Sequence, residues 1–154
     1  MAATVAILMG SKTDMPLMQK AKDVLDEFGV SSEVHVLSAH RSPQQVAEFA
    51  CKAKDQGFKV LIAGAGMAAH LAGTLAAHST LPVIGVPLMA QKELKGMDAL
   101  LSTLQMPKGV PVATVAIDGT ANAAYLAIEI LALSDERLAQ QLKEFRQRQA
   151  LGKS

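Results

Sequence analysis

Short apolar runs alternate with segments of helical periodicity along the chain. Residues 4–9 form an apolar run that ends at Gly10, and apolar positions between Met18 and Phe28 then recur at helical spacing until Gly29 ends the helix. The same unit repeats, so that the expected strands cover residues 4–9, 34–37, 60–63, 83–86 and 112–117. The expected helices cover residues 18–28, 43–53, 95–104 and 120–133, with an alanine-rich helix after residue 66.

This alternation predicts a mostly parallel sheet, because parallel strands need crossover connections that place helices on both faces. We expect a single α/β domain over residues 1–154, folded as a three-layer sandwich in the flavodoxin-like strand order. An extra C-terminal helix is expected at about 134–151, with Leu138, Leu142 and Phe145 in one apolar stripe. The pattern leaves open whether this stripe packs on its own domain or on a neighbouring subunit.

Composition narrows the class of partner. Half of the residues are hydrophobic and 19% are charged, with a formal net charge of +1, so the chain lacks the basic excess of a nucleic-acid binder. Aromatic residues make up 3%, and a single cysteine excludes an internal disulfide. The first residues do not resemble a signal peptide, and no apolar run reaches the roughly 18 residues that span a bilayer. We expect a cytoplasmic protein that binds neither membrane nor nucleic acid.

The ligand crevice of an open α/β sheet lies at the carboxyl ends of the strands, where the strand order reverses. This rule selects the loops at residues 10–14, 38–41 and 64–70. Together they offer hydroxyls, a carboxylate, a guanidinium, two imidazoles and a glycine-rich turn. We therefore expect a site for an anionic polar ligand.

The first two loops differ in how strongly they indicate chemistry. Residues 10–14 enter a helix N-terminus, which favours an anion, although Thr13 or Asp14 as a simple helix cap explains the same pattern. In the second loop, His40 beside Arg41 suits proton transfer on a phosphorylated substrate. The following Ser42 is explained by helix initiation before a proline.

The third loop carries the loose dinucleotide pattern G-x-G-x-x-A from Gly64 to Ala69. The pattern follows the third strand rather than the first, and no acid for a ribose follows the next strand, so a dinucleotide site is disfavoured. A turn that brings backbone amides close to a planar ligand or a carboxylate fits better. We expect His70 in the first turn of the next helix, either touching the ligand or serving a structural role.

The remaining histidines and the cysteine show no metal-binding spacing, so no metal site is expected. His35 belongs to a strand and His78 to a helix end, and both are expected to be structural or surface residues. Cys51 is expected to be a small core residue.

Five stretches carry a family resemblance, and they read MGSKTD (9–14), SAHRSP (38–43), AGAGMAAHL (63–71), LPVIGVP (81–87) and QMP (105–107). In this order they resemble the PurE-type N5-carboxyaminoimidazole ribonucleotide mutases of bacterial purine biosynthesis. The resemblance implies an isomerase that moves a carboxylate from the exocyclic nitrogen of an aminoimidazole ribonucleotide to carbon 4 of its ring, without metal or organic cofactor. It also implies a flavodoxin-like homo-octamer with sites at subunit interfaces and an assembly role for the last helix.

The resemblance also implies roles for individual residues. His40 matches the general acid and base. The matched substrate-binding residues are Ser11, Asp14, Ser38, Arg41, Gly66 and His70, with the stretch from Gly66 to His70 enclosing the migrating carboxylate.

Three positions depart from the family pattern. Met67 and Asp118 stand where the family usually has glycine, and Ala72 stands where it usually has proline. None of them is a proton-transfer or phosphate residue, so we expect an altered loop shape rather than a different reaction.

The sequence also bears on three alternative functions. A related branch of the family carboxylates the aminoimidazole ribonucleotide directly with CO2, and the intact stretch at 63–71 favours the mutase. A phosphoacceptor receiver module is disfavoured because Asp14 stands alone after the first strand and Gly64 follows the third. A flavin-binding module would give a coloured protein.

Overall fold

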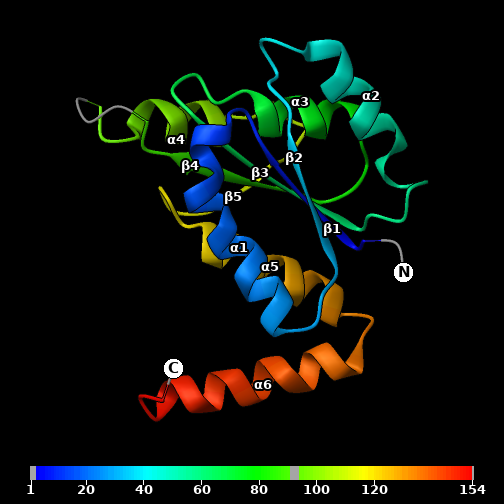
Figure 1. Ribbon diagram of the computed structural model, residues 1–154, viewed down its shortest axis with the longest axis vertical. Coiled ribbons are helices and arrows are strands. Elements are labelled where there is room, and N and C mark those ends of the chain that lie inside the picture. Colours follow the sequence, from blue (N-terminus) through cyan, green and yellow to red (C-terminus); the bar gives the residue numbers. More distant parts are fainter. Residues whose placement is uncertain (1–2, 91–93, 154) are drawn as a thin grey trace.

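The computed structural model describes residues 3–90 and 94–153, and its centre is one parallel five-stranded sheet (Figure 1). The strand order is β2-β1-β3-β4-β5, which confirms the predicted flavodoxin-like arrangement. The strands are β1 (Val5–Met9), β2 (Ser32–Val36), β3 (Val60–Gly66), β4 (Val83–Leu88) and β5 (Ala113–Thr114).

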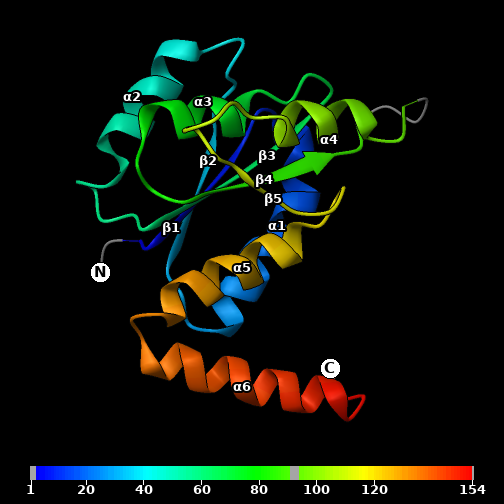
Figure 2. The ribbon, with the colours of Figure 1, turned by 180° about the vertical axis from the view of Figure 1, so that it is seen from behind.

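Helices cover both faces of the sheet, as the two opposite views show (Figures 1 and 2). One face carries α2, α3 and α4, the other carries α1 and α5, and α6 lies outside the layer of α1 and α5. The helices are η1, a short 3₁₀ helix (Lys12–Asp14), α1 (Met15–Glu27), α2 (Pro43–Ala53), α3 (Leu71–His78), α4 (Met97–Leu104), α5 (Thr120–Ala132) and α6 (Glu136–Ala150). No helix within residues 3–90 and 94–153 is long and apolar enough to cross a membrane.

The sheet separates two hydrophobic cores. Along β1, Val5, Ile7 and Met9 face the core shared with α1 and α5, whereas Ala6 and Leu8 face the core shared with α2 and α3. All five residues of β1 are fully buried, because a central parallel strand packs helices on both sides. The rigid middle of the sheet therefore fixes where its strands end.

β3 and β5 differ most in length from the prediction. β3 continues through Gly66 instead of ending at Ala63, because its pairing with β4 extends to Gly66 opposite Leu88. A Cβ at Gly64 would collide with the Met18 side chain, so glycine fits there without a shift of that side chain. β5 is restricted to two residues rather than 112–117. It is an edge strand that pairs with β4 alone, and the backbone N–H of Val115 makes one more bond, to the Gly85 carbonyl, after the strand ends.

The starts of two helices differ from the prediction. Neither Thr13 nor Asp14 provides the side-chain cap after β1; the Ser11 hydroxyl does so by accepting the Thr13 backbone N–H at 3.3 Å. α6 begins at Glu136 rather than at about 134, and the Asp135 carboxylate caps it by accepting the Leu138 backbone N–H at 3.1 Å.

The helix after β5 begins at the first residue of its expected range, 120–133. Thr120 is the first residue of α5, and Gly119 is its N-cap without a side-chain bond. The buried Thr120 hydroxyl has no hydrogen-bond partner among the described residues.

The prediction for Cys51 is wrong, because its side chain is exposed on α2. Val46, Ala50 and Ala53 form the buried stripe of that helix, and Cys51 lies one position away from it. His35 packs against Phe49 and Phe58, which agrees with a structural role.

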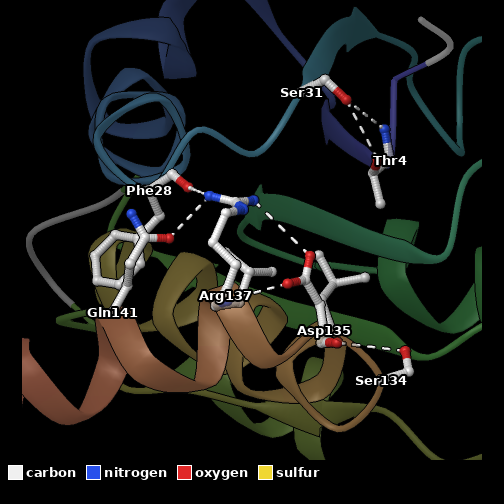
Figure 3. Close-up of polar contacts among 9 residues, drawn as sticks. Thr4, Phe28, Ser31, Ser134, Asp135, Arg137 and Gln141 are labelled. Carbon is white, nitrogen blue, oxygen red and sulfur yellow. Dashed lines mark hydrogen bonds and ion pairs between the residues drawn. The ribbon is translucent and has the colours of Figure 1, made fainter.

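α6 packs on its own chain. Leu138 is buried in the core beneath it, and the Phe145 ring stacks on Tyr125 of α5 with ring centroids 4.7 Å apart. Arg137 donates from Nη1 to the Phe28 carbonyl at the end of α1 at 3.0 Å and to Gln141 at 2.9 Å (Figure 3). A cation at the carboxyl end of a helix is favourably placed in the helix dipole.

This contact predicts the effect of Arg137→Ala. Losing this part-buried, charge-assisted bond should lower the free energy of unfolding by about 0.5–1.5 kcal/mol in a urea titration. Lys143→Ala removes a positive charge from the same helix and serves as the control. Equal stability of the two variants would show that the Arg137 bond does not help to hold α6.

Candidate active site

The predicted loops meet in one cavity of about 460 Å³ at the carboxyl ends of β1, β2 and β3. The strand order reverses here, because β2 lies on one side of β1 and β3 on the other. All the residues predicted for the site line this cavity, namely Ser11, Asp14, Ser38, His40, Arg41, Gly66 and His70. The structure adds Ala90 from the loop after β4, which sequence reasoning missed although that strand ends at the same edge.

The loop after β1 supplies a hydroxyl and a carboxylate. The Ser11 hydroxyl also accepts the Thr13 hydroxyl at 2.8 Å, so its position is fixed from two sides. Burial raises the pKa of Asp14 above its ordinary value, although the Ser11 backbone and the positive charge of Arg41 act in the opposite direction. Asp14 is therefore a half-buried acid that is less acidic than an exposed aspartate.

The loop after β2 is tied to the loop after β1. Arg41 donates from Nη2 to the Gly10 carbonyl at 2.6 Å, and the Ser38 hydroxyl accepts the Arg41 backbone N–H at 3.2 Å. Ser42 donates its hydroxyl to the Ser38 carbonyl at 3.0 Å and makes no side-chain cap bond to α2. The guanidinium is thus held at the entrance of the cavity, where it can meet an anion.

A second cavity of about 380 Å³ adjoins this entrance and includes Lys12 among its lining residues. It shares Ser11, Ser38 and Arg41 with the first cavity. The sequence analysis gave Lys12 no role, although its position in the loop after β1 indicated that it could contribute to the site. Two positive side chains and two hydroxyls at one entrance form a suitable environment for a phosphate.

His40 and His70 are in direct contact inside the cavity. Nε2 of His40 lies 2.7 Å from Nδ1 of His70, and the rings stand nearly perpendicular, at 79°. A hydrogen bond between two imidazole nitrogens requires that one of them carries a proton and the other does not. The pair therefore places a proton donor and a proton acceptor side by side, on the loops after β2 and β3. His70 is the N-cap residue of α3 rather than a member of its first turn.

The loop after β3 adopts a backbone conformation that usually requires glycine. Met67 has φ +57°, and Asp118, in the turn before α5, has φ +56°. These are two of the three positions that depart from the family pattern, so the backbone keeps a glycine-like conformation there. Holding a non-glycine residue in this conformation costs about 1–2 kcal/mol per residue. Asp118 partly compensates, because its carboxylate accepts the Met89 backbone N–H at 3.0 Å. The third departure, Ala72, is buried in α3.

The chemistry of this site is limited to a few roles. No group of three or more histidine, cysteine or acidic side chains among the described residues could hold a metal ion. The entrance can bind an anion, Asp14 can accept hydrogen bonds from hydroxyls, and the histidine pair can transfer a proton. The fold and the cavity thus define an α/β protein that binds an anionic ligand at the switch point of its sheet and has acid–base groups beside it.

Comparisons with known proteins agree with this description. The model of the AIR carboxylase family (AIRC) matches residues 4–151, and the chain belongs to this family. The N5-carboxyaminoimidazole ribonucleotide mutase of Vibrio parahaemolyticus is 54% identical over 94% of this chain and 91% of that protein. The protein of the same name from Pyrococcus abyssi is 52% identical over 93% of this chain and 82% of that protein.

Solved structures share the fold. The Treponema denticola protein PurE2-S38D superposes with a TM-score of 0.88 at 29% identity, covering 99% of this chain and 94% of that chain. Treponema denticola PurE gives a TM-score of 0.84 at 28% identity, covering 97% and 93%.

The raised pKa of Asp14 predicts a stability effect of Asp14→Asn. Since the folded state favours the protonated acid, keeping Asp14 ionised destabilises the fold as pH rises through the folded-state pKa. The uncharged variant should raise Tm at pH 7 by about 1–3 °C. The gain should disappear towards pH 3, where the acid is protonated in both states. A Tm gain independent of pH, or a loss at pH 7, in thermal scans would contradict this account.

Proposed function

We propose that this chain is an N5-carboxyaminoimidazole ribonucleotide mutase that acts in purine biosynthesis. The observation that carries the proposal is the identity of about half the residues, over more than nine-tenths of the chain, to proteins of that name. The cavity supports it, because the reaction needs an anion site for the ribonucleotide and a group that gives and takes a proton.

The entrance of the cavity binds the nucleotide in this proposal. Arg41, Ser11 and Ser38 hold the phosphate at the amino end of η1. Asp14 takes a different part of the ligand, because a carboxylate repels phosphate but accepts hydrogen bonds from ribose hydroxyls. Contacts far from the reacting atoms thereby fix the imidazole ring in place.

His40 performs the proton transfers. It protonates the carbamate nitrogen, the bond from that nitrogen to the carboxyl carbon breaks, and CO2 is released beside the ring. Carbon 4 of the ring then attacks CO2, and His40 removes the proton left on that carbon. The proton given in the first step is regained in the last, so one imidazole serves the whole cycle without an external acid or base.

The loop from Gly66 to His70 encloses the migrating carboxyl group. A Cβ at Gly66 would lie 2.6 Å from Cβ of Ala90, so the backbone at Gly66 passes close to the neighbouring loop. Small side chains at Ala68 and Ala69 allow the carboxylate to approach the backbone. His70 contacts the same ligand from the start of α3.

Direct carboxylation of aminoimidazole ribonucleotide by CO2 is the second candidate function. The observation that favours it is the description of the matching family as AIR carboxylase. The curated relatives named above carry the mutase name at about 50% identity, so we prefer the mutase.

An assay with two substrates tests the function. The purified protein should convert N5-carboxyaminoimidazole ribonucleotide to the carbon-4 isomer at least tenfold faster, at saturation, than it carboxylates aminoimidazole ribonucleotide with bicarbonate. His40→Asn should lower kcat about 10²-fold or more, while nucleotide affinity changes less than about tenfold, because the phosphate contacts remain.

His78→Asn serves as the control, since His78 is the last residue of α3 and lies outside the main cavity. It should retain parental turnover. Faster turnover with bicarbonate would establish the carboxylase instead, and an active His40→Asn enzyme would remove His40 from the mechanism.

We also propose that the protein assembles as a homo-octamer and works in the cytoplasm. An apolar face on α4 supports assembly, because Met97, Leu101 and Leu104 are each about half exposed and recur at helical spacing. A face of this kind is typical of a contact with a second copy.

The free, exposed Cys51 agrees with the proposed location in a reducing compartment. Cell fractionation followed by the mutase assay tests this location.

Light scattering on Leu101→Asp tests the assembly. A buried charge should destabilise the contact, so the mass should fall from that of an octamer to a smaller species. Leu133→Asp, which replaces a leucine that is 89% exposed outside α4, should keep the parental mass. A monomeric parent protein, or equal masses for both variants, would refute the role of the α4 face.

A further inference from the structure

Ser102 of α4 makes a bridge between that helix and the loop after β3. Its hydroxyl accepts the backbone N–H of Ala69 at 2.9 Å and donates to the Asp98 carbonyl at 2.7 Å. The first bond joins positions 33 residues apart in the sequence. Ser102 does not line the main cavity, so it acts from behind the loop.

This bond fixes the direction of one peptide unit next to the histidine pair. A trans peptide is planar, so an Ala69 N–H that points to Ser102 places the Ala68 carbonyl on the opposite side. That carbonyl accepts the His70 backbone N–H at 3.0 Å. The imidazole of His70 then reaches His40 at 2.7 Å. Three hydrogen bonds, joined by the covalent backbone of residues 68–70 and the His70 side chain, thus connect α4 to the imidazole proposed to carry the proton.

The same loop has a reason to need such support. Met67 holds a left-handed conformation that its side chain disfavours, and that side chain is half exposed. A loop in a disfavoured conformation relaxes unless its surroundings hold it in place. The Ser102 hydroxyl lies 3.4 Å from the Met67 carbonyl and also bonds Ala69, between the strained position and His70.

We propose that Ser102 is a positioning residue for the mutase reaction. Its hydroxyl sets the orientation of residues 67–70, and thereby keeps the enclosed carboxyl group and the His40–His70 contact in their productive arrangement. The inference rests on the proposed function. Nucleotide affinity comes from the loops after β1 and β2, which Ser102 does not touch, so its loss should affect the chemical step more than binding.

The test compares Ser102→Ala with Ser79→Ala and Ser102→Thr. Ser79 is the matched control, because its hydroxyl also accepts a backbone N–H, from Leu81 at 3.2 Å, but at the C-cap of α3. Threonine keeps the hydroxyl, and Ser102 borders a cavity of about 330 Å³ between α3 and α4 that can accept a methyl group.

The first measurement is steady-state turnover. Ser102→Ala should lower kcat about 10- to 100-fold with KM within about threefold of the parent, since small misplacements of reacting groups have effects of that size. Ser79→Ala and Ser102→Thr should stay within about threefold of the parent in both constants.

The second measurement follows the carboxyl group with a ¹³C label. When the loop no longer encloses CO2, substrate decays to aminoimidazole ribonucleotide and free CO2, the nitrogen taking a proton in place of the carboxyl group. The fraction of label lost to bicarbonate, after subtraction of the uncatalysed loss, should rise in Ser102→Ala alone.

A kcat and label loss in Ser102→Ala equal to those of Ser79→Ala would overturn the proposal. So would a lowered Tm together with a kcat that returns to the parental value once it is corrected for the folded fraction of enzyme, which indicates general destabilisation. Should Ser102→Ala fail to fold, Ser102→Cys, whose thiol is a weaker acceptor, enters the same comparison. An inactive parent protein would instead contradict the proposed function itself.

Discussion

The reversal of strand order around β1 is the constraint on which the site depends. Because β2 and β3 flank β1 and all three run parallel, their following loops leave the sheet at one edge and on opposite sides of it. Residues 10–14, 38–41 and 66–70 meet there although they are far apart in the sequence. The fully buried β1 makes this meeting point rigid, since both cores pack against it.

The site divides into two parts with different chemistry. At the entrance, Arg41 is held by the Gly10 carbonyl, so the cation is oriented before any ligand arrives. Elsewhere in the lining of the cavity, the His40–His70 contact brings together two exposed imidazoles that can act as acid and base. In the proposed mechanism, this separation lets the nucleotide be fixed by the anion site while the carboxyl group moves beside the histidine pair.

Much of this arrangement was predictable from the sequence. The β-branched runs and the glycine stops predicted the order of strands and helices, and the switch-point rule predicted which loops meet. The strands β1 and β4 were predictable because central parallel strands are apolar throughout. The predicted site residues all line one cavity, and their individual roles remain proposals.

The features that were missed or predicted wrongly depend on how the folded chain packs. Ser102 belongs to no motif, and only the folded chain reveals that it bonds Ala69. β5 pairs with β4 over two residues only, which its apolar sequence does not indicate. Cys51 was assigned to the core by residue type, whereas its angular position on α2, one residue past Ala50, decides its exposure.

The most direct test of the account is a crystal structure of the protein with aminoimidazole ribonucleotide. The phosphate should lie within hydrogen-bond distance of Arg41 and Ser11, and the exocyclic nitrogen or carbon 4 of the ring should lie about 3 Å from a ring nitrogen of His40. A nucleotide bound outside the cavity between the three loops, or one whose ring lies beyond the reach of His40, would contradict the account.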